Sequence, residues 1–187
     1  MKSRAWIAAI AVSLLQTGAI GTIIASRAMH LAQGREIFLK AIPVDPRDLL
    51  RGDYARMNYE VSTIPGSLAP LSVRISQGTA VFITFERQGA PEEGKWVPKG
   101  VALEKPVGPE DDGKAVLRGT VKWGGNGMDL HVVYGIETYF VPENTGGDLE
   151  KAAREGSVKA VIAVDRGGKA AIKGLVIGGV RLAEPAL

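Results

Sequence analysis

A segment of 22 residues without a charged side chain, close to the N-terminus, constrains this chain more than any other feature. It reads AWIAAIAVSLLQTGAIGTIIAS and covers residues 5–26. An α-helix rises about 1.5 Å per residue, so this segment would span roughly 33 Å, enough for a hydrocarbon core of about 30 Å. Lys2 and Arg4 precede it, and basic residues favour the cytoplasmic flank. We therefore predict a cytoplasmic N-terminus at residues 1–4 and a transmembrane anchor at residues 5–26.

A cleaved signal peptide is the alternative interpretation of the same segment. Signal peptides carry an apolar region of about 7–15 residues, followed by a cleavage site with the pattern small-x-small, in which x is any residue. The apolar run here is longer, and the best candidate site, Ser26-Arg27-Ala28, has an arginine in its middle. An uncleaved anchor therefore fits better, and both interpretations export the rest of the chain.

The net charge of +3 belongs to the anchor region rather than to the rest of the chain. Four of the 23 Lys and Arg residues precede Glu36, whereas all 20 Asp and Glu residues lie at Glu36 or beyond. The exported part thus has 19 basic and 20 acidic residues, which is no electrostatic footprint for nucleic acid. We expect a membrane protein without a nucleic-acid partner.

Two residue types limit the chemistry of the exported part. The chain has no cysteine, which excludes disulfides, a thiolate nucleophile and thiolate metal ligands. Its two histidines, His30 and His131, are far apart in sequence and show no ligand spacing. We expect neither a metal site nor a cofactor, and a domain held together by its own hydrophobic core.

The residues after the anchor follow the pattern of an all-β protein. Short apolar or alternating runs recur between turns rich in glycine, proline and acidic residues. We predict an exported β-rich domain over residues 35–187, built as an antiparallel barrel or sandwich of about nine strands with one or two short helices. The helices are expected near Asp45-Pro46 and over residues 149–155. The strands are expected at residues 35–44, 51–61, 79–87, 95–105, 115–123, 128–143, 157–165, 169–177 and 178–182.

Several segments, in a specific order, resemble the GDYXXLXY family of bacterial proteins. The signature reads GDYARMNY at residues 52–59, with Met57 in place of the usual leucine, a substitution that conserves volume and apolarity. Further similar segments are PVDPRDLL before the signature, GIETYFVPE at residues 135–143, DLE at 148–150 and VDRGGKAAIKGLVIGGVRL near the C-terminus.

The resemblance implies a single-pass protein of the bacterial inner membrane with its C-terminal domain in the periplasm. Members of the family are found beside, or fused to, multispanning membrane proteins that are themselves uncharacterised. The resemblance therefore implies a multispanning inner-membrane protein as partner, and it brings no catalytic residues.

The signature segment is the first candidate site. Its polar and aromatic residues fill one turn and one strand, where Gly52 permits a conformation closed to other residues and tyrosines can pack into a core while their hydroxyls find partners. The segment is either a structural turn and strand or a recognition surface. The candidate residues are Arg51, Asp53, Tyr54, Arg56, Tyr59 and Glu60.

The second candidate site lies on the predicted strand 128–143. There Glu137 and Tyr139 would share one face, so that a carboxylate and a phenol line a groove with Glu143 at its mouth. The alternative is that Glu137 forms a structural ion pair, because carboxylates among apolar residues mark functional sites only in some proteins.

The predicted anchor offers a third candidate, a contact surface for another helix. Small residues at successive i+4 positions line one face, and the amide of Gln16 lies near the middle of the membrane. Small side chains let helices approach closely, and an amide can hydrogen-bond across the contact. The alternative is an ordinary anchor rich in alanine and glycine. The candidate contact residues are Ala9, Ser13, Gln16, Thr17, Gly21 and Ala25.

These features favour an accessory or interaction domain over an enzyme. Serines and lysines are plentiful, but no motif places a base beside a hydroxyl nucleophile. Two alternatives stay open: an envelope hydrolase that uses a Ser–Lys pair or two carboxylates, and a barrel that binds a ligand in an apolar cavity.

Overall fold

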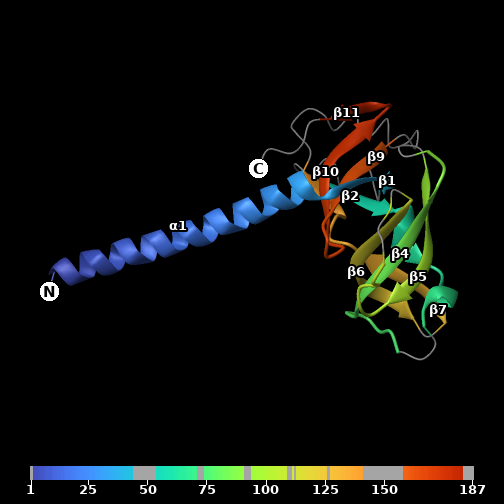
Figure 1. The fold of residues 1–187 in the computed structure, drawn as a ribbon, viewed down its shortest axis with the longest axis horizontal. Coiled ribbons are helices and arrows are strands. Elements are labelled where there is room, and N and C mark those ends of the chain that lie inside the picture. The colour runs from blue at the N-terminus through green and yellow to red at the C-terminus, as the bar shows by residue number, and fades with distance from the viewer. Residues whose placement is uncertain are drawn as a thin grey trace.

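The computed structural model describes residues 2–43, 54–70, 74–90, 94–108, 111, 113–125, 127–140 and 158–182. One long helix leads from the N-terminus into a β domain, and the helix projects away from that domain over most of its length (Figure 1). The short helices predicted near Asp45 and at residues 149–155 lie outside the described residues.

Helix α1 (Lys2–Gln33) is a single element of 32 residues. It contains a stretch, Ala9–Gln33, that is long and apolar enough to cross a membrane, and the 18-residue apolar window within that stretch is not buried against the domain. The helix continues beyond the uncharged run by Arg27–Gln33, about two turns. The β domain begins directly after it, because strand β1 starts at Arg35.

The described strands form two antiparallel sheets, as in a sandwich, rather than one closed barrel. The prediction of a mostly β fold is confirmed. The six-stranded sheet has the order β11-β10-β9-β1-β2-β8, and the five-stranded sheet has the order β3-β7-β6-β4-β5. The strands of the first sheet are β1 (Arg35–Pro43), β2 (Tyr54–Tyr59), β8 (Thr138–Phe140), β9 (Val158–Val164), β10 (Ala170–Ile177) and β11 (Val180–Leu182). Those of the second are β3 (Thr63–Ile64), β4 (Ala80–Gln88), β5 (Lys95–Ala102), β6 (Lys114–Gly125) and β7 (Met128–Val133).

One hydrophobic core lies between the sheets. Strand β4 shows the expected alternation, with Val81, Ile83 and Phe85 buried. In β9 nearly every side chain is buried, which fits a strand in the middle of its sheet that is also contacted by α1. Two single-turn 3-10 helices, η2 (Glu60–Ser62) and η3 (Gly66–Leu68), flank the short β3. The sequence pattern did not indicate any of these three elements.

The prediction of one long strand over residues 128–143 is wrong. The chain leaves the five-stranded sheet after Val133 and enters the six-stranded sheet at Thr138 as β8. Gly135 lies in the break with a φ of +80°, a conformation that residues with a Cβ seldom adopt. Because the strand starts only at Thr138, the expected common face of Glu137 and Tyr139 does not exist. This break carries the chain from one sheet to the other.

Candidate functional site

Two buried tyrosines tie the signature strand to the break between β7 and β8. The Tyr59 hydroxyl donates a hydrogen bond of 2.7 Å to the carbonyl oxygen of Ile136. In the opposite direction, the Tyr134 hydroxyl donates one of 2.6 Å to the carbonyl oxygen of Val61. Burial, followed by the nearby charge of Glu137, raises the pKa of both phenols far above their ordinary range. These hydroxyls are structural donors that stay protonated.

Glu137 holds the same break through the backbone. Its Oε1 accepts a hydrogen bond of 2.6 Å from the amide of Tyr134, and its Oε2 accepts one of 2.9 Å from the amide of Gly135. Its own carbonyl oxygen accepts a bond of 2.9 Å from the amide of Met57 in β2. Both carboxylate oxygens are therefore engaged in fixing the turn, and no arginine is needed to pair with Glu137.

The described side chains among the predicted recognition residues lie in different surroundings. Tyr59 and Tyr139 are buried, Glu60 is half-buried, and β2 pairs with β8 from Tyr54↔Phe140 to Arg56↔Thr138. The two candidate segments thus lie side by side in one sheet, although their described functional groups do not gather around one cavity. Arg51, Asp53 and Glu143 lie outside the described residues, as do the side chains of Tyr54 and Arg56.

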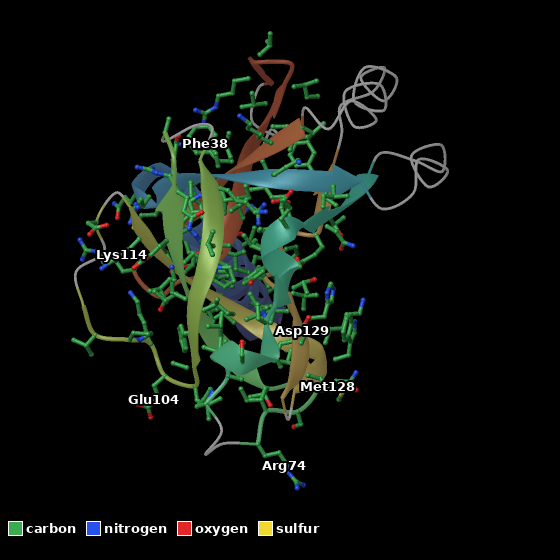
Figure 2. The ribbon with its side chains drawn as sticks, turned by 90° about the vertical axis from the view of Figure 1, so that its right-hand side faces the viewer. Phe38, Arg74, Glu104, Lys114, Met128 and Asp129 are labelled. Carbon is green, nitrogen blue, oxygen red and sulfur yellow. The ribbon has the colours of Figure 1, made fainter. Side chains whose placement is uncertain are left out.

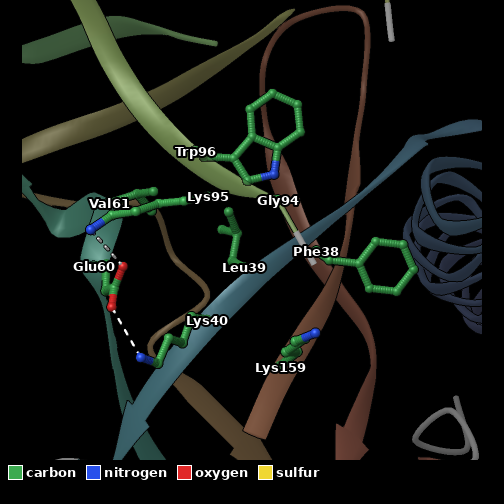
Figure 3. Close-up of a pocket in the computed structure, with 9 residues that line it drawn as sticks. All are labelled: Phe38, Leu39, Lys40, Glu60, Val61, Gly94, Lys95, Trp96 and Lys159. Carbon is green, nitrogen blue, oxygen red and sulfur yellow. Dashed lines mark ion pairs between the residues drawn. The ribbon is translucent and has the colours of Figure 1, made fainter. Parts of the chain in front are cut away.

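Glu60 belongs to a cavity of about 320 Å³ beside β1 and β5 (Figure 3). Its two carboxylate oxygens lie 3.3 Å from Lys40 Nζ and 3.4 Å from Lys95 Nζ, so it bridges two strands of different sheets. Partial burial opposes ionisation of Glu60, but the two ammonium groups prevail and lower its pKa. Further lining residues are Phe38, Leu39, Val61, Gly94, Trp96 and Lys159.

Trp96 is the unusual member of this cavity. The residue is only 5% exposed, yet its indole Nε1 has no hydrogen-bond partner among the described residues. Arg87 lies over its ring at 5.8 Å from the centroid. Buried donors are almost always paired, so the unpaired Nε1 makes Trp96 an exception among the described residues.

A second and larger cavity, of about 770 Å³, lies where α1 meets the β domain. His30 fixes this junction: its Nδ1 lies 4.0 Å from Asp165 Oδ2, and its Nε2 lies 3.3 Å from the carbonyl oxygen of Ala163 in β9. The cavity is lined from α1, from the break before β8 and from the start of β10. Its lining residues are Ile23, Ser26, Arg27, His30, Leu31, Gly135, Thr138, Tyr139, Asp165, Lys169, Ala170, Ala171 and Ile172.

No local sequence pattern indicates either cavity, because the residues that line each of them come from distant segments. Arg27 and Lys169 line one cavity although 141 residues separate them. The only local signal was Arg27 itself, the first charge after the uncharged run. In the described part of the chain, no group of three His, Asp or Glu side chains could hold a metal ion.

The predicted helix-contact face is open to its surroundings. Ser13, Gln16, Thr17, Gly21 and Ala25 are all exposed on α1. A Cβ added at Gly21 would meet no atom within 4 Å. The β domain therefore covers none of this face.

Comparison with known proteins gives one match. The family model described as GDYXXLXY protein matches residues 16–175, which covers the second half of α1 and the β domain as far as Leu175 in β10. No curated protein and no solved structure matches the chain.

Proposed function

The chain belongs to the GDYXXLXY family, and from this premise we propose that it is an accessory or interaction domain anchored in the bacterial inner membrane. Its α1 crosses the membrane, its β domain lies in the periplasm, and a multispanning inner-membrane protein contacts α1. The proposal extends what the fold supports, which is a β domain behind one apolar helix.

The observation that carries the proposal is the side chain of Gln16. It is exposed near the middle of the uncharged run, and its amide makes no hydrogen bond within the described residues. A carboxamide in hydrocarbon without a partner is costly. By contrast, Thr22 Oγ1 and Ser26 Oγ each donate a bond of 2.8 Å to their own helix backbone and need no partner. A second helix that hydrogen-bonds to Gln16 would remove the cost.

The face around Gln16 is suited to such a helix. Ser13 and Gln16 are three residues apart and therefore adjacent on the helix surface. The small residues Ser13, Thr17 and Gly21 follow one another at i+4 positions beside Gln16 and permit close backbone approach, and the domain places no atom where a Cβ on Gly21 would lie. A partner helix would bury a face that the domain leaves uncovered.

Affinity purification from native membranes tests the partner. Gln16→Leu removes the amide at similar volume, and Gly21→Leu blocks close approach. Leu15→Val is the matched control, because Leu15 is exposed and points about 100° away from Gln16 and about 120° away from Gly21 on the helix. We expect a multispanning protein to co-purify with the wild-type chain and with the control. The amount of this protein recovered should fall about three- to thirtyfold with each of the other two variants. If no membrane protein co-purifies with the wild-type chain, the partner proposal fails.

The absence of cysteine makes the topology equally testable. Ser76 is exposed in the turn before β4, so Ser76→Cys provides one reactive thiol in the β domain. A membrane-impermeant maleimide should label it in spheroplasts with an intact inner membrane, and Ser3→Cys should be labelled only after permeabilisation. The reverse pattern would place the domain in the cytoplasm.

Ligand binding is a second candidate function, favoured by the unpaired Trp96 Nε1 in the Glu60 cavity. The cavity volume is at the lower end of the range for small-molecule sites, roughly 300–1,000 Å³. Native mass spectrometry of the purified chain should then detect a bound small molecule that Trp96→Phe loses. An identical spectrum for the two proteins would remove this candidate. Glu137 is no longer a candidate catalytic residue for the hydrolase alternative, because backbone amides donate hydrogen bonds to both oxygens of its carboxylate.

A further inference from the structure

The cavity at the helix–domain junction lies where lipid headgroups would be. The uncharged run ends at Ser26, and α1 continues through Arg27–Gln33, about 10 Å beyond the hydrocarbon core. The headgroup layer adds roughly 5–8 Å on each side of that core. Ile23, Ser26, Arg27, His30 and Leu31 all line the cavity, so it straddles the boundary between acyl chains and headgroups.

The lining is divided between apolar and cationic side chains. Ile23 of α1, on the membrane side of Arg27, supplies apolar surface of the kind an acyl chain contacts, and Leu31 and Ile172 line the side of the cavity towards the domain. Arg27 and Lys169 supply positive charge from opposite ends of the sequence. Neither of these two side chains forms an ion pair or hydrogen bond within the described residues. Two cations without partners, set beside apolar walls, suit an amphipathic anion.

The acidic residue of the cavity does not neutralise these cations. Asp165 Oδ1 accepts hydrogen bonds of 2.8 Å from the backbone amides of both Gly167 and Lys169. Its Oδ2 faces His30 Nδ1 at 4.0 Å. Asp165 is thus engaged by the turn between β9 and β10 and by the helix end, and the lining keeps a net positive charge.

Tyr139 provides an independent indication that the cavity takes a polar ligand. The residue is 3% exposed, and its hydroxyl has no hydrogen-bond partner among the described residues. Tyr59 and Tyr134, the two other buried tyrosines of this region, both donate to backbone carbonyls. Buried hydroxyls are normally paired, and a bound molecule that draws the Tyr139 ring towards the cavity would give the hydroxyl the partner that the described residues do not supply.

We propose that this cavity binds an anionic phospholipid, with Arg27 and Lys169 at its phosphodiester, Tyr139 hydrogen-bonded to its headgroup and Ile23 against its first methylenes. The inference rests on the membrane insertion of α1 in the proposed function. The bound lipid fills the junction and fixes the β domain against the membrane surface. A partner protein is not required for this binding.

Native mass spectrometry of the full-length chain tests the proposal. The protein is reconstituted in nanodiscs of phosphatidylethanolamine and phosphatidylglycerol, released into mild detergent, and its retained lipids are counted. Arg27→Gln with Lys169→Gln removes the two cations, and Tyr139→Phe removes only the hydroxyl. Arg74→Gln with Lys122→Gln is the matched control, because both side chains are exposed outside the cavity and Arg74 lies at the far end of the domain (Figure 2).

We expect the wild-type chain and the control to retain phosphatidylglycerol in preference to phosphatidylethanolamine. Retention should fall about tenfold in the double cation variant and about threefold in Tyr139→Phe, with the domain still folded by circular dichroism. Equal retention by the wild-type chain and the double cation variant would overturn the proposal. Displacement of the lipid by millimolar inorganic phosphate would also overturn it and would assign the cavity to free phosphate.

Carbonate extraction of membranes separates this failure from failure of the proposed function. If the wild-type chain is released by carbonate, α1 does not span the membrane and the proposed anchoring fails together with the lipid site. If the chain stays in the membrane but lipid retention does not depend on Arg27 and Lys169, the lipid inference alone is overturned.

Discussion

Tyr59 donates a hydrogen bond of 2.7 Å from its buried hydroxyl to the carbonyl oxygen of Ile136, 77 residues further along the chain. The bond joins the last residue of the signature GDYARMNY to the segment GIETYFVPE. Tyr134 makes the complementary contact with Val61. Two of the segments that carry the family resemblance are therefore parts of one buried hydrogen-bonded unit that connects the two sheets.

Removing the Tyr59 hydroxyl should destabilise this unit. Tyr59→Phe leaves the Ile136 carbonyl without its donor, and a buried group that loses its partner costs about 1–3 kcal/mol. The control is Tyr139→Phe, which removes a buried hydroxyl that has no hydrogen-bond partner among the described residues. In lipid-free detergent, urea unfolding followed by circular dichroism should show a lower unfolding free energy for Tyr59→Phe and an equal or higher one for the control. An equal loss of unfolding free energy in both variants would contradict a stabilising role for the hydrogen bond from Tyr59 to Ile136.

Glu137 should be required for folding rather than for chemistry. In Glu137→Gln, one of the two acceptor oxygens becomes an NH₂ group that faces a backbone N–H. The free energy of unfolding should therefore fall by about 1–3 kcal/mol. Glu104→Gln makes the same chemical change at an exposed position and should be neutral. Thermal unfolding of both variants beside the wild-type chain measures the difference. A stable Glu137→Gln domain would show that the two bonds are dispensable.

The β domain should lose stability as pH falls below about 6.5, because His131 is harder to protonate in the folded chain. Partial burial, and then the charge of Lys122, lower the pKa of His131, while Glu137 opposes them. Between the ordinary His pKa and this lower value, the unfolded chain binds a proton that the folded chain does not. His131 also stacks on Trp123, with ring centroids 4.9 Å apart.

Urea midpoints at about pH 7.5 and pH 5.5 check this prediction. The decrease between the two values should be smaller in His131→Gln than in the wild-type chain, whereas groups other than His131 contribute equally to both proteins. An identical decrease would exclude His131 as the cause.

A side chain at Gly34 should loosen the junction between α1 and the domain. A Cβ there would lie 2.6 Å from the His30 carbonyl oxygen and 2.8 Å from the Ala163 Cβ. Gly34→Val therefore forces the helix end away from β9, at a cost of about 1–3 kcal/mol. Gly100→Val adds the same side chain to β5 with no atom within 4 Å of its Cβ. Trypsin should cleave after Arg35 about fivefold faster in Gly34→Val and at the wild-type rate in Gly100→Val.

Most strands were predictable from the chain because their burial follows a local pattern. Strand β4 alternates regularly, and the residues at 79–87 were expected to form it. The break between β7 and β8 was missed although Gly135 interrupts the apolar run. A single glycine fits a bulge within one strand as well as a crossing between sheets, and the deciding hydrogen bonds come from Tyr59 and Glu137.

Four properties could be predicted from the residues alone, namely the apolar helix, the absence of thiol chemistry, the β-rich character and the family, because each depends on residue type, local period or segment order. The roles of Glu137 and Tyr139, in contrast, depend on the folded chain. The carboxylate of Glu137 accepts hydrogen bonds from two backbone amides, and the phenol of Tyr139 is buried without a hydrogen-bond partner among the described residues. Likewise, Arg27 follows the uncharged run in sequence, but only folding places it beside Lys169 in one cavity. Contacts between residues more than a hundred positions apart arise from the packing of α1 on the sheet, which no local pattern encodes.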